Sequence, residues 1–261
     1  MCLLAIAFQT HPDAPLIVTS NRDEFYPRPT AAMHWWEDAP ILAGKDLQAG
    51  GTWLGLSRSG RFAAVTNYRY IPENGEIETK PLSQGHLVTD FLCSTQSSED
   101  WALSIASSAA DYGGFNLLLY DGPALVYLNN YQNQAPQTLA PGVYALSNNS
   151  LDSPWPKVDH ARQELCAVID GPDMGAAQLP ELIAALSLQK TYAPELLPNT
   201  GLPQDWEELL SSPFIVAEGY GTRASAAIVI SASAQVAAME TTHEAGARLG
   251  SQVFNYRTFE R

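Results

Sequence analysis

The chain has 261 residues, with 14 lysines and arginines against 28 aspartates and glutamates, and a formal net charge of −14. This acidic excess argues against a nucleic-acid backbone or an anionic membrane surface as the main partner. No apolar stretch approaches the roughly 18 residues of a membrane helix. The three cysteines, at positions 2, 93 and 166, form no paired framework, so we expect a cytoplasmic protein.

Apolar runs bounded by turn residues predict strands in the first part of the chain. The strands expected there are 2–8, 16–20, 50–56 and 61–67, the last two joined as a hairpin. The continuous apolar run in 16–20 is typical of a strand that is covered on both faces. Pro27 and Pro29 then interrupt regular structure, and 41–48 reads as a loop.

Helices and further strands follow in alternating blocks. The expected helices are 83–93, 98–110, 155–169 and 179–188, and the expected strands are 115–120, 124–129, 142–147, 214–217, 224–231, 235–241 and 252–259. Segment 192–213 contains four prolines and reads as a long loop with a short helix at 204–210. Short connections between strands predict mainly antiparallel sheets, covered by helical layers in one domain over 1–261.

Cys2 opens the first predicted strand, and its position has a chemical consequence if Met1 is removed. Cys2 would then carry a thiol and a free α-amine. An α-amine with a pKa of about 7.7–8.0 is a suitable base for the thiol near neutral pH. The alternative is a small packed residue at the start of an apolar strand.

Four polar residues, Asn21-Arg22-Asp23-Glu24, directly follow the second predicted strand. They fit either a solvated turn or the rim of a pocket. In a pocket, Asp23 would orient an ammonium or a thiol, and the fixed positive charge of Arg22 would lower the pKa of a nearby thiol.

Two asparagines and one arginine pose a similar choice. Asn67 and Asn148 each follow an apolar strand, where an asparagine either caps a turn or donates its amide to a developing oxyanion. Arg223 follows a glycine-rich turn and enters an apolar strand, where a buried guanidinium needs a partner. The five histidines lack ligand spacing, and no phosphate-binding glycine motif is present, so we expect neither a metal nor a cofactor.

Six short segments, spread from the first strand to the last loop, form a specific combination. They are Met1-Cys2, Ser20-Asn21-Arg22-Asp23-Glu24, Gly51-Thr52-Trp53-Leu54-Gly55, Thr66-Asn67-Tyr68-Arg69, Leu146-Ser147-Asn148 and Tyr220-Gly221-Thr222-Arg223. Together they resemble the NRDE family, which is also the transport and Golgi organisation protein 2 family. That family is in turn similar to cysteine-type N-terminal nucleophile hydrolases, such as choloylglycine hydrolase and penicillin V acylase.

The resemblance implies an α+β fold, a four-layer α-β-β-α sandwich, and cleavage of linear amides. The site residues that it implies are Cys2 as nucleophile, Arg22 and Asp23 beside it, Asn67 and Asn148 on the oxyanion or amine side, and Arg223 after the last loop. The adjacent Arg22-Asp23 step departs from the acylases, where two residues usually separate this pair.

The sequence therefore predicts a cysteine amidohydrolase that cleaves a small acylated amide through a thioester at Cys2. The rival hypothesis is a protein that binds or traffics a lipid-like or haem-like ligand in the same pocket without turnover. The candidate apolar walls of that pocket are Trp35, Trp36, Trp53 and loop 192–213, for which ordinary packing is the alternative. A third hypothesis is an inactive scaffold with protein partners.

Overall fold

The computed structural model describes residues 2–72, 80–131 and 135–259. The contacts divide the chain into two compact units, each with one sheet and its own helices. Unit 1 contains Met1–Pro27, Arg69–Ile77 and Pro141–Tyr256, and unit 2 contains Arg28–Tyr68, Glu78–Ala140 and Arg257–Arg261. The predicted α+β class with two mostly antiparallel sheets is confirmed, whereas the assignment of 1–261 to one domain stays a prediction.

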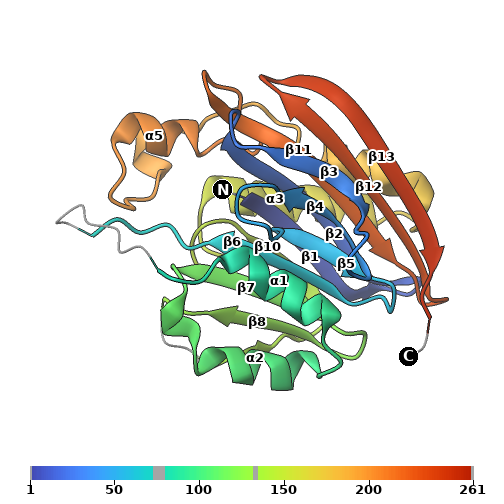
Figure 1. The fold of residues 1–261 in the computed structure, drawn as a ribbon. Coiled ribbons are helices and arrows are strands. Elements are labelled where there is room, and N and C mark those ends of the chain that lie inside the picture. The colour runs from blue at the N-terminus through green and yellow to red at the C-terminus, as the bar shows by residue number, and fades with distance from the viewer. Residues whose placement is uncertain (1, 73–79, 132–134, 260–261) are drawn as a thin grey trace. The chain divides into compact units, whose positions relative to one another are not determined.

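The sheet of unit 1 has six strands in the order β10-β1-β2-β11-β12-β13 (Figure 1). Its strands are β1 (Cys2–His11), β2 (Ala14–Phe25), β10 (Gly142–Leu146), β11 (Tyr220–Ile230), β12 (Gln235–Glu244) and β13 (Ala247–Arg257). β1 and β2 each have an antiparallel neighbour on both sides. A central strand pairs its backbone groups with both neighbours, which suits the apolar runs predicted at 2–8 and 16–20.

Helices cover one face of this sheet. The helical segments of unit 1 are α3 (Pro156–Ile169), η2 (Ala176–Gln178), α4 (Leu179–Ala184), η3 (Pro194–Leu196) and α5 (Gln204–Leu209). Leu3 and Ala5 of β1 lie in one buried cluster with Leu165 of α3 and Leu182 of α4. The intervening residue Leu4 is buried as well, so β1 is covered on both faces.

Unit 2 repeats this two-layer arrangement with seven strands in sequence order, β3 to β9. Its strands are β3 (Thr30–Trp35), β4 (Ile41–Asp46), β5 (Leu54–Ser57), β6 (Phe62–Asn67), β7 (Phe115–Tyr120), β8 (Leu125–Asn129) and β9 (Gln137–Thr138), and its helices are α1 (Gln84–Cys93), α2 (Ser98–Ala106) and η1 (Ala109–Asp111). Phe91 of α1 and Trp101 of α2 pack edge to face, 5.4 Å apart, in one buried cluster with Leu117 of β7. These apolar contacts hold both helices against the sheet.

Two predicted segments are wrong. Segment 41–48, expected to be a loop, contains β4, whose Gly44 weakens the strand signal in the sequence. This glycine is needed because the Trp53 ring occupies the place where a Cβ would lie. Segment 214–217, expected to be a strand, forms only an isolated bridge between Val216 and Gly221, because the chain turns back at Gly219 with a φ of 75°.

The polar residues after the second predicted strand do not form a solvated turn. They continue β2 between β1 and β11, and Asp23 is 1% exposed. The amide of Asn21 donates to the carbonyl oxygens of Leu186 and Pro213, both at 2.9 Å, and accepts from the Ser225 hydroxyl at 2.6 Å. Asn21 therefore has a structural role and ties β2 to the segments after α4 and α5.

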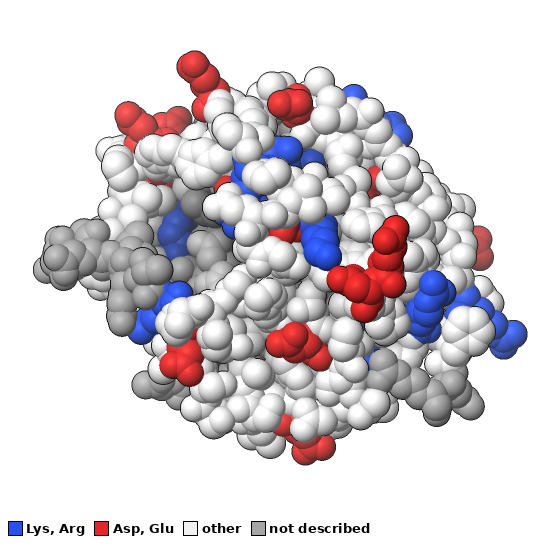
Figure 2. Space-filling view, viewed as in Figure 1, with Lys and Arg blue, Asp and Glu red and all other residues white. Residues whose placement is uncertain are grey.

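Charged side chains of both signs are interspersed among uncharged residues on the described surface in Figure 2. Such a surface agrees with the chain's low charged fraction of 16%. In residues 2–72, 80–131 and 135–259, no helix combines the length and apolar character needed to cross a membrane.

Candidate active site

The register of β1 and β2 places Cys2 directly opposite Arg22. Arg22 is 5% exposed, and its Nη2 lies 3.8 Å from the carboxylate of Glu24. Cys2 is partly exposed at the start of β1. The predicted neighbours Cys2 and Arg22 thus lie side by side on adjoining strands, while Met1 is outside the described residues.

Asp23 is a buried acid on the same strand as Arg22. Its Oδ1 accepts a hydrogen bond of 2.7 Å from the Thr222 hydroxyl, whose oxygen accepts one of 2.9 Å from the Ile215 N–H. Burial raises the pKa of Asp23, while the charge of Lys157 and the hydrogen bond from Thr222 act in the opposite direction. The ionised carboxylate therefore depends on nearby cations.

The Cys2 thiol lies in an environment that favours its neutral form. Burial raises the thiol's pKa above the ordinary value, and the negative charge of Asp23 acts in the same direction. Arg22 acts in the opposite direction without cancelling this effect. A neutral thiol is a poor nucleophile, so chemistry at Cys2 requires a base that removes the proton during the reaction.

Asn148 lies at the same end of the sheet as Cys2. It is fully buried, one residue after Ser147, whose Oγ lies 3.0 Å from the Cys2 carbonyl oxygen. The Asn148 carbonyl accepts a hydrogen bond of 2.6 Å from the Arg69 N–H. The structure thereby brings the predicted Asn148 close to the backbone of Cys2, and the buried backbone bond holds its main chain in place.

Arg223 lies at a bulge in β11, where the register with β2 shifts between Thr222 and Ala224. Its Nη1 donates to the carbonyl oxygens of Phe25 and Tyr26, at 3.1 and 2.8 Å. A bulge turns a side chain away from its regular direction, and here it aims Arg223 at the end of β2. These two hydrogen bonds are the partners that a guanidinium at this position was expected to need. A catalytic role for Arg223 stays a prediction.

Asn67 ends β6 in unit 2, where it pairs with Phe115 of β7. Cys2, Arg22, Asp23, Asn148 and Arg223 all belong to unit 1. The role of Asn67 beside an oxyanion stays a prediction.

Two buried polar residues of unit 1 were missed by the sequence reading. Lys157, the second residue of α3, is 2% exposed and donates from Nζ to the Leu210 carbonyl at 2.7 Å. Tyr220 is 4% exposed, and its hydroxyl has no hydrogen-bond partner among the described residues. Burial raises the pKa of Tyr220, and Asp23 adds to this. A lysine in the first turn of a helix is unfavourable for the helix dipole, but the sequence carries no signal that Lys157 is buried.

Aromatic side chains from three elements meet near Asp23. Phe25 of β2 packs edge to face on Tyr220 of β11 at 5.0 Å, and Trp206 of α5 contacts the same ring at 5.7 Å. Phe25 is 53% exposed. Trp206, from the predicted loop 192–213, therefore packs against Tyr220 in unit 1, and its role as a pocket wall stays a prediction.

The tryptophans that were predicted as further walls pack within unit 2. Arg58 lies over the Trp35 ring, Lys45 lies over the Trp36 ring, and the Trp53 ring packs against Gly44. These contacts match the alternative reading of ordinary packing.

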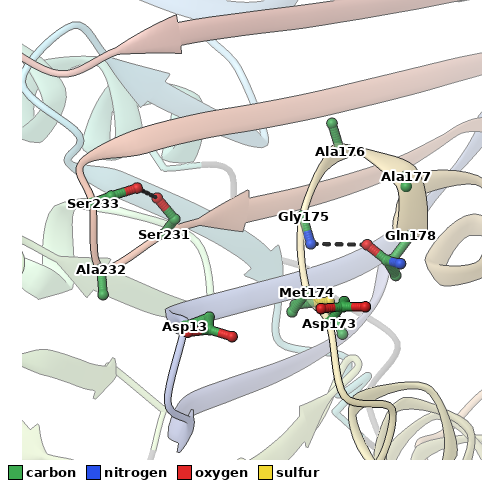
Figure 3. A pocket seen from close by; sticks show the side chains of 10 residues that line it. All are labelled: Asp13, Asp173, Met174, Gly175, Ala176, Ala177, Gln178, Ser231, Ala232 and Ser233. Atoms are coloured by element: carbon green, nitrogen blue, oxygen red, sulfur yellow. Dashed lines mark hydrogen bonds between the residues drawn. The ribbon is translucent and has the colours of Figure 1, made fainter.

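A separate hollow lies where β1 turns into β2, at the opposite end of these strands from the Cys2–Arg22 pair (Figure 3). It has a volume of about 560 Å³ and includes Asp13, Asp173, Gln178, Ser231 and Ser233. Its lining contains no cysteine, histidine, lysine or arginine. The serine hydroxyls there have no histidine or lysine beside them to act as the base that activates a hydroxyl, so this hollow is a weaker candidate than Cys2 for acyl transfer.

No disulfide joins two of the cysteines among the described residues. Cys93 is exposed, and Cys166 is partly exposed like Cys2. Within the described ranges, no group of three or more histidine, cysteine, aspartate or glutamate side chains is arranged to hold a metal ion.

Comparison with known proteins gives a consistent assignment. Residues 1–245 match the model of the family described as Transport and Golgi organisation 2. The Transport and Golgi organization protein 2 homolog of Bos taurus is 32% identical over 254 residues, covering 90% of this chain and 91% of that protein. The homolog of Homo sapiens is 30% identical over 258 residues, with the same coverage.

Among solved structures, the chain is similar to the Caenorhabditis elegans ortholog of N-acylethanolamine-hydrolyzing acid amidase, with a TM-score of 0.46 and 11% identity over 87% of this chain and 92% of that chain. The sequence matches extend over nearly the whole chain and include the segments around Cys2, Asp23 and Asn148. The chain belongs to the Transport and Golgi organisation 2 family.

Proposed function

We propose that the chain is a cysteine N-terminal nucleophile amidohydrolase that cleaves a small acylated amide. The observation that supports this most is the position of Cys2 at a strand end. It is paired with Arg22 and linked through Ser147 to the neighbourhood of the buried Asn148. A thiol, a fixed cation and a buried amide at one sheet end are the parts that acyl transfer needs.

The reaction begins after removal of Met1 has freed the α-amine of Cys2. The amine takes the thiol proton while Sγ attacks the acyl carbon, and the Asn148 amide donates to the oxyanion. The same proton passes to the leaving nitrogen, the C–N bond breaks, and the acyl group remains on Cys2 as a thioester. A water molecule, deprotonated by the α-amine, then hydrolyses the thioester and releases a carboxylic acid.

The electrostatics of Cys2 favour a base-assisted mechanism over a preformed thiolate. Burial raises the pKa of the thiol, so little thiolate exists at neutral pH. An α-amine in the same residue has a pKa near the working pH and needs no conformational change to reach the thiol. The Asp23 carboxylate orients the ammonium that forms.

The substrate class follows from the surroundings of the thiol. Phe25, Trp206 and Tyr220 offer an aromatic wall for the acyl chain or another apolar part of the substrate. The protein works in the cytoplasm, a reducing compartment, which fits cysteines that form no disulfide among the described residues.

Labelling with an electrophilic acyl probe tests the proposal. Accessibility alone favours Cys93, which is more exposed than Cys2 and Cys166. We expect Cys2 to be labelled first, as measured by peptide mass spectrometry, and Cys2→Ala to abolish this product. Cys166→Ala is the matched control and should label like the wild type.

Intact mass provides the second measurement. The protein isolated from its native host should lack Met1, and full retention would rule out the α-amine mechanism. Equal labelling of all three cysteines, or none, would contradict the proposal. That outcome would favour a protein that binds a lipid-like or haem-like ligand without turnover.

A further inference from the structure

Asn148 lies just beyond the strand pair that precedes it. The described pairing of β10 with β1 ends at Leu146, opposite Leu4, yet Asn148 is fully buried. Its carbonyl oxygen accepts a hydrogen bond of 2.6 Å from the Arg69 N–H. A group that stabilises an oxyanion must be held to within about 0.5 Å of its productive place. The place of Asn148 therefore depends on what fixes Arg69.

The Arg69 side chain is held between two elements of unit 1. Its Nη2 forms an ion pair of 3.1 Å with Glu207 Oε2 on α5, and neither side chain is more than 5% exposed. The guanidinium also lies over the Trp155 ring, 4.8 Å from its centre. Trp155 directly precedes α3 and packs in the buried cluster of that helix. All three side chains line one small cavity, so Arg69 bridges α5 and the start of α3.

Glu207 is itself fixed by the loop before α5. Its Oε1 accepts hydrogen bonds from the Thr200 N–H at 2.8 Å and from the Thr200 hydroxyl at 2.5 Å. The Thr200 carbonyl in turn accepts from the Ile71 N–H at 2.8 Å. At Gly201, where φ is 87°, a Cβ would lie 2.5 Å from the Ile71 carbonyl oxygen. The segment that begins at Arg69 and the loop before α5 therefore lie in direct contact.

Stability alone does not explain a buried ion pair here. Apolar side chains of similar volume often serve as well or better, because buried charges lose their hydration. A guanidinium and a carboxylate instead favour one defined geometry. Arg69 and Glu207 are thus suited to fixing the position of whatever is attached to them.

We propose that Arg69 is a positioning residue, and that its ion pair with Glu207 sets the place of Asn148 beside the oxyanion. This proposal rests on the proposed function, because the Asn148 amide is the oxyanion donor of that mechanism. The Arg69 side chain takes no part in proton transfer. It acts through the backbone bond from its own N–H to the Asn148 carbonyl oxygen.

The test compares two reagents that modify Cys2. Attack on an electrophilic acyl probe forms an oxyanion, whereas iodoacetamide reacts by displacement of iodide and forms none. The variant Arg69→Met/Glu207→Gln removes both charges and keeps the oxygen that accepts from Thr200. We expect acyl-probe labelling of Cys2 to become about tenfold slower in this variant. The iodoacetamide alkylation profile of Cys2 between about pH 6 and 9 should remain that of the wild type.

Three further variants calibrate the result. Asn148→Ala should slow acyl-probe labelling about a hundredfold, because it removes the oxyanion donor itself. Arg69→Lys keeps the charge opposite Glu207 and should label faster than the neutral double variant. Arg28 and Asp46 form an ion pair of 2.7 Å in unit 2. Arg28→Met/Asp46→Asn is therefore the matched control and should react like the wild type with both reagents.

Wild-type acyl-probe labelling in the folded Arg69→Met/Glu207→Gln variant, together with slow labelling in Asn148→Ala, would overturn this proposal and leave the proposed function intact. An equal decline with both reagents would also overturn it, because the site would then be generally distorted. Labelling in Arg69→Lys as slow as in the double variant would assign the effect to packing on Trp155 instead of the ion pair.

Two other outcomes are distinct from these. If Asn148→Ala labels at the wild-type rate, the proposed function fails at Asn148 and the role of Arg69 falls with it. If the double variant does not fold, Glu207→Gln alone provides the test, because it removes the charge opposite Arg69 and changes a single atom of the side chain.

Discussion

Each unit buries a group of polar side chains, and the two groups differ in charge and in hydrogen bonding. The unit 2 network consists of Thr66, Asn116, Tyr127 and Asn129, each at most 4% exposed. Asn116 Oδ1 accepts from the Tyr127 hydroxyl at 2.7 Å and from Asn129 Nδ2 at 2.6 Å, and Asn116 Nδ2 donates to Thr66 at 3.1 Å. All of these groups are uncharged, and they satisfy one another.

The Cys2 cluster of unit 1 consists of Cys2, Asp23, Lys157 and Tyr220. It combines an acid, a cation and a thiol, and burial shifts the pKa of each toward the neutral form. The Tyr220 hydroxyl has no partner among the described residues. Buried polar groups that lack partners are costly, and they concentrate where a protein binds or transforms another molecule.

The comparison suggests that the polar groups of the unit 2 network stabilise the fold, whereas those of the Cys2 cluster have a role in the proposed reaction. Neutral amides and hydroxyls that pair internally specify one arrangement and lower the free energy of the folded state. Buried charged groups lose their hydration, and their attraction to opposite charges on other elements only partly offsets this cost, so they raise the free energy of the folded state. Substitutions in the unit 2 network should therefore destabilise the fold, whereas substitutions in the Cys2 cluster should leave its stability nearly unchanged or increase it.

Asn116→Leu should have the largest effect. It removes three hydrogen bonds and leaves the Tyr127 hydroxyl and the Asn129 amide buried without their acceptor. We expect a loss of about 3–4 kcal/mol in the free energy of unfolding, measured by urea titration. The Cys2 alkylation profile of the folded variant should remain that of the wild type. A loss below about 1 kcal/mol would contradict a structural role for the network.

Lys157→Met should instead stabilise the fold. The pKa of Lys157 is lowered from 10.5 to about 8, so the folded state favours the neutral amine, and the charged amine costs stability below pH 8. We expect the variant to gain up to about 3 kcal/mol at pH 7. Wild-type stability recovers as the pH rises, so the difference should shrink between pH 8 and 10.5. Urea titrations at pH 7 and 10 measure this, and a loss of stability at pH 7 would contradict it.

The sequence predicts strands well where apolar runs are continuous and poorly where polar residues lie inside a sheet. Segments 2–8 and 115–120 are strands as predicted. The second strand was expected to end at residue 20, but β2 continues to Phe25. Pairing with β1 and β11 on both sides holds its backbone there whatever the polarity of its side chains.

The same distinction applies to the candidate site. Cys2, Arg22, Asp23 and Asn148 were predicted as site residues because they stand at the ends of predicted strands in a recognisable combination, and their catalytic roles stay predictions. Lys157 was missed because a lysine in the first turn of a predicted helix reads as a surface residue. Its burial depends on the Leu210 carbonyl, 53 residues further along the chain, and no local pattern reveals such a contact.

Asp23→Asn should affect reactivity rather than stability. The substitution keeps the oxygen that accepts from Thr222 but removes the charge that orients the α-ammonium. We expect acyl-probe labelling of Cys2 to slow about tenfold, a change of about 1.4 kcal/mol in the activation free energy. Alkylation by iodoacetamide should not slow, because Asp23 raises the pKa of the thiol. An equal decline in both reactions would indicate a general distortion of the site.

Two buried tyrosines offer the smallest and most closely matched test. In Tyr127→Phe, the lost hydroxyl donates to Asn116, so we expect a loss of about 1 kcal/mol in the free energy of unfolding. In Tyr220→Phe, the lost hydroxyl has no described partner, so stability should change by less than about 0.5 kcal/mol. Parallel urea titrations measure the difference. Equal losses in both variants would show that the Tyr220 hydroxyl is paired in solution, and the proposed contrast between the Cys2 cluster and the unit 2 network would then fail at this residue.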